Sequence, residues 1–273
     1  MTVPANNDQL ADQARQWWKT RIIDIEPGKI AIKGRPIETM IGNVGYAGMV
    51  WTMLRDDEAT PAQLALLEAA LVAAVDHGPQ APSIAIARMS MTCGVSLNGA
   101  MASAINVLDD IHGGAGEQCL ELFKAVEHVP GWQADIPGAV KQALADQVAA
   151  GGTIVPGYGH RFHPVDPRAV RLLELVDQAA AEGSINGRYA AIGREVEVQL
   201  EARVGKKIPM NIDGATAIIY GELGFEPSLA RGLFILSRSV GILAHAWEQK
   251  QQGGRIKGPL PPSLGYTYTG LRT

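Results

Sequence analysis

Apolar residues recur at helical spacing through most of the chain. Residues 61–76 open with a proline, which suits a first helical turn, and keep their apolar residues on one wide stripe. Residues 83–107 are rich in Ala, Met and Ile and are apolar on almost every face, which is typical of one or two helices buried inside a domain. The same spacing predicts six further helices, at 116–127, 136–149, 167–182, 186–204, 214–223 and 227–249.

Strand signals are confined to the N-terminal part. Residues 20–34 contain two short β-branched runs around Pro27-Gly28, which predict a small hairpin. We therefore expect an all-α fold with a small N-terminal β-hairpin. Glycine-rich stretches at 113–116 and 150–158 are predicted linkers. The proline-rich stretch after Gly253 is predicted to be an irregular arm that can reach a second subunit.

Three short polar clusters interrupt the apolar pattern. They read IHGGAG at 111–116, PGYGHR at 156–161 and NIDGAT at 211–216. Each places one titratable side chain, His112, His160 or Asp213, beside glycine and ahead of a helical run, where bulk is low and backbone N–H groups are exposed. Two histidines and a carboxylate presented in this way suit chemistry on a carbonyl compound, because a base must move a carbon-bound proton while donors hold the oxygen.

Composition narrows the class of protein. The chain has 273 residues, 47% hydrophobic and 19% charged, which indicates a globular protein with room for two domains. The net charge of −4 gives no general attraction to nucleic acid or to an anionic membrane, so neither partner is expected. The cysteines lack a CxxC spacing, so no disulfide framework and no metal site is expected, and Cys93 is predicted to be a buried small side chain.

The N-terminus lacks a secretory signal pattern and no apolar run is long enough to span a membrane, so a cytoplasmic location is expected. Common catalytic motifs are also missing. The sequence contains no GxxxxGK[ST], no strand-borne GxGxxG, no HExxH and no GxSxG, which removes the usual signals for phosphoryl transfer, nicotinamide chemistry, zinc hydrolysis and serine hydrolysis.

The polar clusters, taken with three other segments, resemble the motifs of the citrate synthase superfamily. The similar segments are GYGHR at 157–161 with DPR at 166–168 (GxGH…DPR), HGGA at 112–115, NID at 211–213 (NVD), SRSVG at 237–241 with AH and EQ after it, and KGRPIE at 33–38 (YRGxPIE). Their order and approximate spacing agree from about residue 20 to the end, which is nearly the whole chain. One motif alone would be weak, but five in order are hard to explain by chance.

The resemblance implies three catalytic residues. Asp213 aligns with the carboxylate that takes a proton from the methyl group of acetyl-CoA, or returns it in the reverse direction. His112 aligns with the histidine that hydrogen-bonds the thioester oxygen, and His160 with the histidine that holds the oxaloacetate carbonyl. Each also has a plainer interpretation from the residues alone; Asp213, for example, could simply cap the helix that follows it.

The resemblance also implies binding residues for an acyl-CoA and a 2-oxo acid. His77 aligns with a histidine that contacts the 2-oxo acid, although it is equally suited to the C-terminal end of a helix. Arg168 and Arg238 align with arginines that clamp carboxylates, a role that fits the planar guanidinium. Arg238 lies in an apolar helix, where it needs a carboxylate from the protein or a ligand. The implied coenzyme A contacts are Val155, Pro156, Gly157, Tyr158, Gly159 and Arg161.

The short chain and the Asp-His-Gly-Pro stretch at 76–79 most resemble citryl-CoA lyases, including the lyase module of ATP-citrate lyase. Many citrate synthases carry an arginine near the C-terminus that enters the partner subunit's site; here Gly258 stands there, with Arg255 and Lys257 nearby. We therefore expect cleavage of citryl-CoA, or a related 3-hydroxy-acyl-CoA, to acetyl-CoA and oxaloacetate. The alternatives are a citrate or 2-methylcitrate synthase and a non-catalytic CoA-binding or assembly subunit.

The family's architecture implies a large helical domain of residues 1–112 with 226–273 and a small helical domain of residues 113–225. It also implies a homodimer or a higher homo-oligomer.

Overall fold

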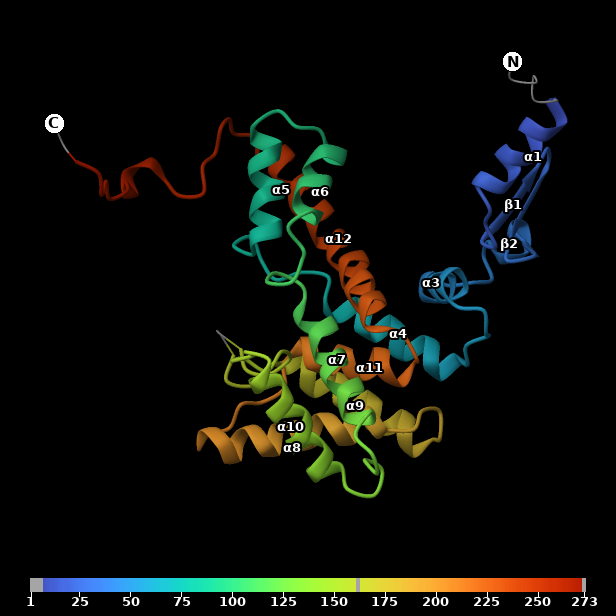
Figure 1. Ribbon diagram of the computed structural model, residues 1–273. Coiled ribbons are helices and arrows are strands. Elements are labelled where there is room, and N and C mark those ends of the chain that lie inside the picture. Colours follow the sequence, from blue (N-terminus) through green and yellow to red (C-terminus); the bar gives the residue numbers. More distant parts are fainter. Residues whose placement is uncertain (1–6, 161–162, 272–273) are drawn as a thin grey trace, which may run out of the picture. The chain divides into compact units, whose positions relative to one another are not determined.

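The computed structural model describes residues 7–160 and 163–271. This part of the chain contains twelve α-helices, one 3-10 helix and three short strands, which confirms the predicted all-α fold with a small sheet (Figure 1). Contacts divide the chain into two compact units, Met1–Leu64 (unit 1) and Ala65–Thr273 (unit 2). The predicted division at residues 113 and 226 is a different one and stays a prediction.

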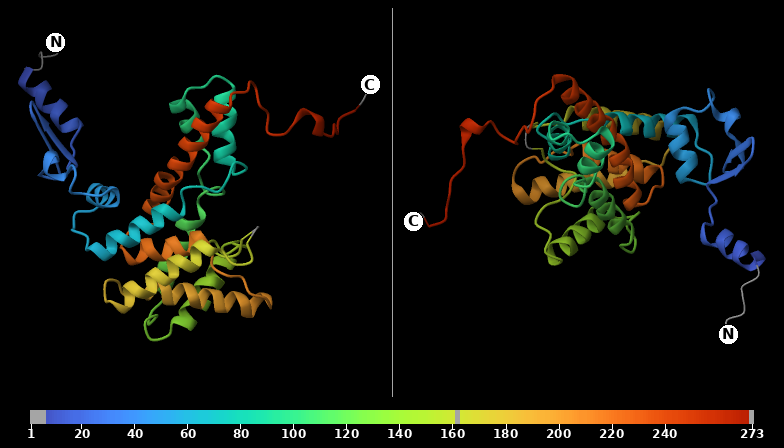
Figure 2. Two further views of the ribbon diagram at one scale, coloured as in Figure 1. Left: turned by 180° about the vertical axis from the view of Figure 1, so that it is seen from behind. Right: turned by 90° about the horizontal axis from the view of Figure 1, so that it is seen from above.

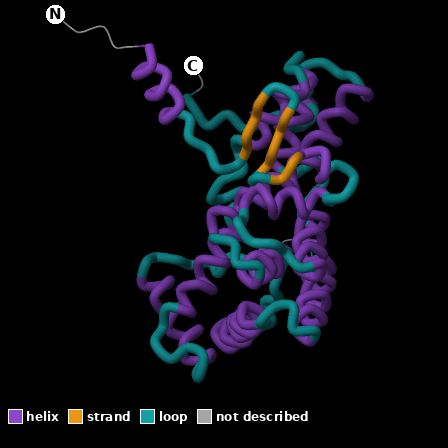
Figure 3. The backbone as a smooth tube through the Cα atoms, turned by 90° about the vertical axis from the view of Figure 1, so that its right-hand side faces the viewer, coloured by secondary structure: helices purple, strands orange, loops and turns teal. Residues whose placement is uncertain are grey.

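Unit 1 contains the predicted hairpin. Strands β1 (Ile23–Glu26) and β2 (Lys29–Ile32) pair antiparallel, and β3 (Arg35–Pro36) extends the sheet beside β2 (Figure 3). Gly28 adopts φ 78° in the connecting turn, a conformation that glycine reaches without a steric penalty. Three helices that the hydrophobic pattern did not predict complete the unit, namely α1 (Asn7–Trp17), α2 (Ile37–Met40) and α3 (Tyr46–Leu54).

Unit 2 is helical. Its elements are α4 (Pro61–Ala73), which begins in the last residues of unit 1, α5 (Pro82–Thr92), α6 (Leu97–Ile105), α7 (Ala115–Glu127), α8 (Ile136–Ala149), α9 (Pro167–Ala181), α10 (Arg188–Val204), α11 (Ile212–Glu222), α12 (Pro227–Gln252) and the 3-10 helix η1 (Pro262–Leu264). The apolar segment 83–107 is thus two helices. Cys93 follows α5 and is exposed, so its predicted burial is wrong: the segment breaks there into a turn at the surface.

Helix starts in unit 2 follow local chemistry. Proline stands in the first turn of α5, α8, α9 and α12, where its missing N–H costs no hydrogen bond. Side chains cap three of the helices: Asp135 caps α8, Asp166 caps α9 and Asn211 caps α11, each accepting from backbone N–H groups of the first turn. Two of these caps, at Asp166 and Asn211, belong to the polar motifs, so the motifs also set where the helices begin.

Helix α12 links two groups of helices within unit 2. It packs against α5 and α6 along one part of its length and against α7 along another, while α11 packs on α7, α9 and α10 (Figures 1 and 2). Small side chains such as Ala87, Ala100 and Ala246 allow α5, α6 and α12 to approach closely around Ile84 and Ile242. Among the described helices α12 is long and apolar enough to cross a membrane, a property that buried core helices share.

Candidate active site

Backbone hydrogen bonds join the second and third polar clusters. Asn211 donates from its backbone N–H to the Gly157 carbonyl at 2.9 Å, and its side-chain amide donates to the Gly159 carbonyl at 2.7 Å. Gly157 adopts φ 85°, and a Cβ there would lie 2.6 Å from Cys119 Sγ and 2.9 Å from Gly214 Cα. Only glycine fits this close approach, which fixes the 157–159 loop beside the start of α11.

Asp166 ties the same region to Arg168. Its carboxylate is buried and accepts from Arg168 Nε at 3.0 Å and Nη2 at 2.9 Å, in the two-pronged geometry typical of arginine and carboxylate. It also accepts from the backbone N–H of Ile212 at 3.1 Å. Arg168 therefore lies beside Asp213, and two of its nitrogens, Nε and Nη2, already bind Asp166. The remaining N–H groups of the guanidinium can bind a ligand.

Asp213 occupies the first turn of α11 but does not cap it. Asn211 Oδ1 accepts from the backbone N–H of Asp213 and of Gly214, so the capping role suggested for Asp213 belongs to Asn211. The Asp213 carboxylate is consequently left for chemistry. Burial raises its pKa and Asp166 adds to this, whereas Arg168 and Arg238 oppose the rise. A carboxyl group with a raised pKa is a better base than an exposed one, and in its protonated form it can return a proton.

His112 is held in one ring orientation by Ser83, a fully buried residue of α5. The Ser83 backbone N–H donates to His112 Nε2 at 3.2 Å, and Ser83 Oγ lies 3.0 Å from the same nitrogen. Burial and then Arg238 lower the pKa of His112, which favours the neutral ring. Because Nε2 is an acceptor, the proton of the neutral ring is on Nδ1. His112 can therefore donate a hydrogen bond from Nδ1 while remaining uncharged.

His77 and His160 lie together. Their ring centroids are 5.5 Å apart. The backbone N–H of His163 donates to His160 Nδ1 at 3.1 Å, so Nε2 carries the proton of the neutral His160 ring. Burial lowers the pKa of both histidines. The positive charges of Arg168 and Arg238 lower the pKa of His77 further. His163 and Arg168 lower the pKa of His160 further, and the Asp166 carboxylate raises the pKa of both rings.

Arg238 is a buried cation on α12. Its Nε donates to the Ala74 carbonyl at 3.0 Å, and its guanidinium lies 4.9 Å from the centroid of the Phe234 ring. Burial lowers its pKa, while the negative charges of Asp76 and Asp213 raise it. Within the described chain no carboxylate lies close enough to form an ion pair with it. A buried guanidinium in this state is suited to a ligand carboxylate.

These contacts and charges bring together the six residues predicted to act on the substrate. Arg238 acts electrostatically on His77, His112 and Asp213, and Arg168 acts on His77, His160 and Asp213. All six lie in unit 2, although they are spread over more than 160 positions of the sequence. The site therefore combines two guanidinium groups, three neutral histidines and one carboxyl group of raised pKa.

The predicted coenzyme A loop is described as far as His160. Gly157 and Gly159 form the glycine turn described above. The Tyr158 side chain is buried and donates to the Gly193 carbonyl at 2.8 Å, so this residue supports the loop and offers a ligand only its backbone. Val155 and Pro156 are partly exposed. Arg161 lies outside the described residues.

Sequence reasoning missed two sets of supporting residues. Ser83 orients His112 across 29 positions, and nothing in the surrounding sequence marks it. His245 accepts from Arg88 at 3.1 Å through Nδ1 and faces Asp76 at 3.3 Å through Nε2, which connects α12 to the segment carrying His77. These contacts give His245 a structural role, and its partners could be found only from the fold.

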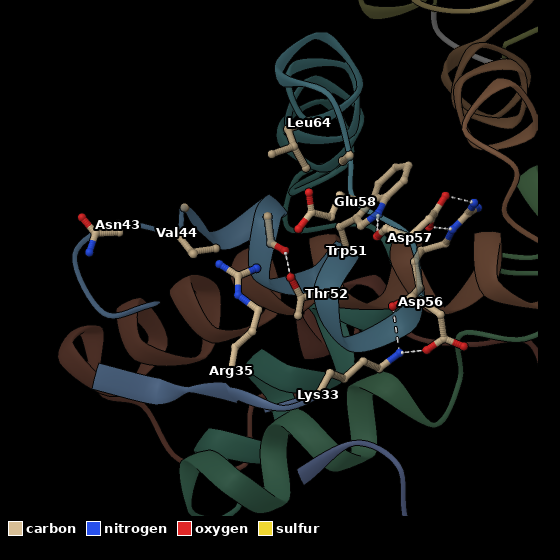
Figure 4. A pocket seen from close by; sticks show the side chains of 14 residues that line it. Lys33, Arg35, Asn43, Val44, Trp51, Thr52, Asp56, Asp57, Glu58 and Leu64 are labelled. Atoms are coloured by element: carbon tan, nitrogen blue, oxygen red, sulfur yellow. Dashed lines mark hydrogen bonds and ion pairs between the residues drawn. The ribbon is translucent and has the colours of Figure 1, made fainter. Parts of the chain in front are cut away.

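Unit 1 has a cavity of its own, of about 470 Å³, lined among others by Lys33, Arg35, Trp51 and Arg55 (Figure 4). Its cations are largely matched by acids: Lys33 bonds Asp56 at 2.6 Å, and Arg55 pairs with Asp57. The predicted catalytic residues all lie elsewhere, in unit 2. Over residues 7–160 and 163–271, histidine, cysteine and carboxylate side chains form no group of three or more that could hold a metal ion.

Known proteins share both the sequence and the fold. Residues 13–259 match the family model described as citrate synthase, C-terminal domain. The citrate synthases of Acidithiobacillus ferridurans and Synechocystis sp. are 27% and 28% identical over 80% and 81% of this chain. The matches cover 54% and 53% of those proteins, so the chain spans about half the length of these curated relatives.

Among solved structures, citryl-CoA lyase from Hydrogenobacter thermophilus superposes with a TM-score of 0.81 at 29% identity, covering 94% of this chain and 96% of that one. ATP citrate lyase from Methanothrix soehngenii, solved with citrate and coenzyme A, shares the fold with a TM-score of 0.78 at 20% identity, covering 99% of this chain and 45% of that one. With the family model matching most of its length, the chain belongs to the citrate synthase family.

Proposed function

We propose that this chain cleaves citryl-CoA, or a closely related 3-hydroxy-acyl-CoA, into acetyl-CoA and oxaloacetate. The observation that carries the proposal is the surroundings of Arg238. This buried guanidinium lies among His77, His112 and Asp213, and no carboxylate of the described residues is within ion-pair distance of it. A ligand carboxylate would therefore pair with its charge, within reach of a proton donor and a base. Such a site suits a substrate with both a carboxylate and a carbonyl or thioester group.

Cleavage needs two proton movements. The hydroxyl proton of the substrate passes to the neutral His160 ring, the carbon–carbon bond breaks, and its electron pair enters the thioester as an enolate. Because His160 Nδ1 accepts from the His163 N–H, taking that proton at Nε2 requires a change of tautomer and release of this contact. Asp213 carries a proton in the citryl-CoA complex, which its raised pKa favours, and gives this proton to the enolate carbon; this forms the methyl group of acetyl-CoA and leaves oxaloacetate. Before the next turnover His160 releases its proton to solvent and Asp213 takes one up.

His112 supports this reaction from the thioester side. Its Nδ1–H donates to the thioester oxygen, where the negative charge of the enolate develops. One positioned donor of this kind contributes on the order of 3–4 kcal/mol in acyl-transfer enzymes. Coenzyme A would pass along the 155–159 loop, whose backbone lies beside the start of α11.

Two observations support cleavage over synthesis. The lyase from Hydrogenobacter thermophilus has a TM-score of 0.81 with this chain, against 0.66 for the citrate synthase from Thermoplasma acidophilum. Gly258 also stands where many citrate synthases supply an arginine. The curated relatives, however, are named citrate synthase, and His112 suits either direction. Synthesis of citrate or 2-methylcitrate is therefore the second candidate.

An assay of both directions tests the proposal. Purified protein mixed with citryl-CoA should release oxaloacetate, which malate dehydrogenase reports by oxidation of NADH. Free CoA released from acetyl-CoA and oxaloacetate would instead indicate the synthase. Protein that binds CoA but shows neither activity would contradict both and favour a non-catalytic subunit. A sample carrying Arg194→Gln, a surface change on α10 away from the site, serves as the preparation control.

A further inference from the structure

Arg231 binds both sides of the His112 loop. It lies on α12, and its Nη1 and Nη2 donate to Asp109 and Asp110, each at 2.5 Å, just before His112 in the sequence. Its Nε contacts the carboxylate of Glu117, in the first turn of α7 just after the loop. One guanidinium on a third segment thus holds the two ends of the turn that presents His112.

We propose that Arg231 is a positioning residue that sets where the His112 ring lies. This inference rests on the proposed function for its kinetic consequence, but the position of the ring can be measured without any substrate. None of the motifs that indicated the family includes Arg231.

Two other hydrogen bonds restrain the loop: the Asp109 N–H donates to the His112 carbonyl at 3.0 Å, and Gln118 Nε2 donates to the Asp110 carbonyl at 3.1 Å. Neither of them ties the loop to α12. Ile111 is 99% exposed, and the side chains of Asp109 and Asp110 are largely exposed as well. The acidic groups also crowd one another: burial and then Glu117 and Asp110 raise the pKa of the nearby Glu121, while Arg231 opposes that rise. Without Arg231 the carboxylates on the two sides of His112 would repel, and the loop would lose this link to α12.

On its inner side the loop fits α12 and α5 closely. Gly113 adopts φ 110°, and a Cβ at this position would lie 3.0 Å from the Phe234 ring. Phe234 lies three positions after Arg231, and Arg238 lies seven positions after Arg231, so the three side chains share one face of the helix. The His112 ring then reaches across to Ser83 on α5. A shift of the loop away from α12 therefore breaks the bond that fixes the His112 tautomer.

Arginine suits this position for a geometric reason. Its planar guanidinium presents nitrogens in several fixed directions, so Nη1 and Nη2 donate to Asp109 and Asp110 while Nε lies in ion-pair contact with Glu117. A lysine ammonium keeps the charge but cannot occupy the same three positions at once. We expect Arg231→Lys to retain only part of the effect.

The test compares Arg231→Gln with the wild type by two independent readouts. In uniformly ¹⁵N-labelled protein, the Nε2 and Nδ1 resonances of His112 and the amide of Ser83 should shift or broaden as the Ser83 bond is lost. With citryl-CoA, kcat should fall on the order of 10–100-fold, as for other residues that orient a catalytic group, with KM changed much less. Arg194→Gln removes a comparable surface ion pair, to Asp177, and should change neither readout.

Arg231→Lys should fall between the wild type and Arg231→Gln in both readouts. If Arg231→Gln does not fold, the double variant Asp109→Asn with Asp110→Asn can replace it. This variant removes the two aspartate charges that Arg231 binds and should give the same shifts of the His112 ring resonances. Unchanged His112 resonances, or kcat within about twofold of the wild type, would overturn the inference. If the wild type has no lyase activity the proposed function fails, whereas the ring resonances still decide the role of Arg231.

Discussion

At the residue scale, Asp213 is a predicted catalytic residue that lowers the stability of the folded chain. Its carboxylate is buried next to Asp166, and these two influences outweigh Arg168 and Arg238, so its pKa is raised. A group with a raised pKa favours folding below its unfolded value, 3.8, and loses that contribution as the pH rises through the folded value. At neutral pH the charged form therefore lowers the free energy of unfolding.

We expect Asp213→Asn to abolish cleavage and to stabilise the protein at pH 7.5. The amide is the same size and carries no charge, so the desolvation cost disappears. A gain of about 1 kcal/mol would raise the melting temperature by about 2–4 °C in a chain of this size. Thermal unfolding at pH 7.5 and near pH 4 measures this, and the difference should shrink at the lower pH. An amide variant that is less stable than the wild type at pH 7.5, or that remains active, would refute the assignment.

At the element scale, α12 acts as a common support for the loops of the site. Arg231 and Phe234 contact the His112 loop, and His245 faces the Asp76 carboxylate near the other end of the helix. Between them, Gly241 packs against the segment that leads to His77: a Cβ at Gly241 would lie 2.1 Å from the Val75 carbonyl oxygen. A single rigid helix therefore sets the spacing between the two histidine loops.

The glycines of α12 provide a matched test of this support. Gly241→Ala adds a methyl group against backbone and should cost about 1–3 kcal/mol, as overpacking usually does, and should also lower kcat by displacing His77. Gly232→Ala in the same helix meets nothing within 4 Å, so it should stabilise by about 0.5–1 kcal/mol through helix propensity. Urea unfolding gives both values. Equal effects of the two substitutions would show that α12 does not press against the Val75 segment.

Hydrophobic periodicity predicted most of the helices of unit 2, because long amphipathic helices have a strong local sequence signal. Helix α8 matches its prediction at both ends, and α7 and α12 begin within one residue of theirs. The short helices α2 and α3 were not predicted, since a few turns give little periodicity. The members of the candidate site were predicted from ordered motifs, but the bonds that orient them, such as Ser83 to His112, join distant segments. Only the folded chain shows such pairs.

At the scale of the whole molecule, the site makes stability depend on pH in a defined direction. Burial lowers the pKa of His77, His112 and His160 below 6.5. Around pH 6.5 the unfolded chain therefore binds more protons than the folded one, and stability rises with pH. The contribution of these histidines is complete above 6.5 and is lost as the pH falls through their folded values. The lowered pKa values of Asp76 and Asp166 act in the same direction, but only in the range below 3.8.

We therefore expect the free energy of unfolding to fall between pH 7.5 and pH 5.5, with activity lost in the same direction because the site requires neutral rings. A histidine variant separates this cause from general acid destabilisation. His112→Gln removes one of the titrating groups, so its stability should fall less steeply over this range than that of the wild type. Arg194→Gln, the surface control on α10, removes no histidine and should leave the slope unchanged. Urea unfolding at several pH values measures the slopes. If His112→Gln follows the wild-type slope, the ring is not held neutral by burial, and its role as an uncharged donor to the thioester oxygen loses its physical basis.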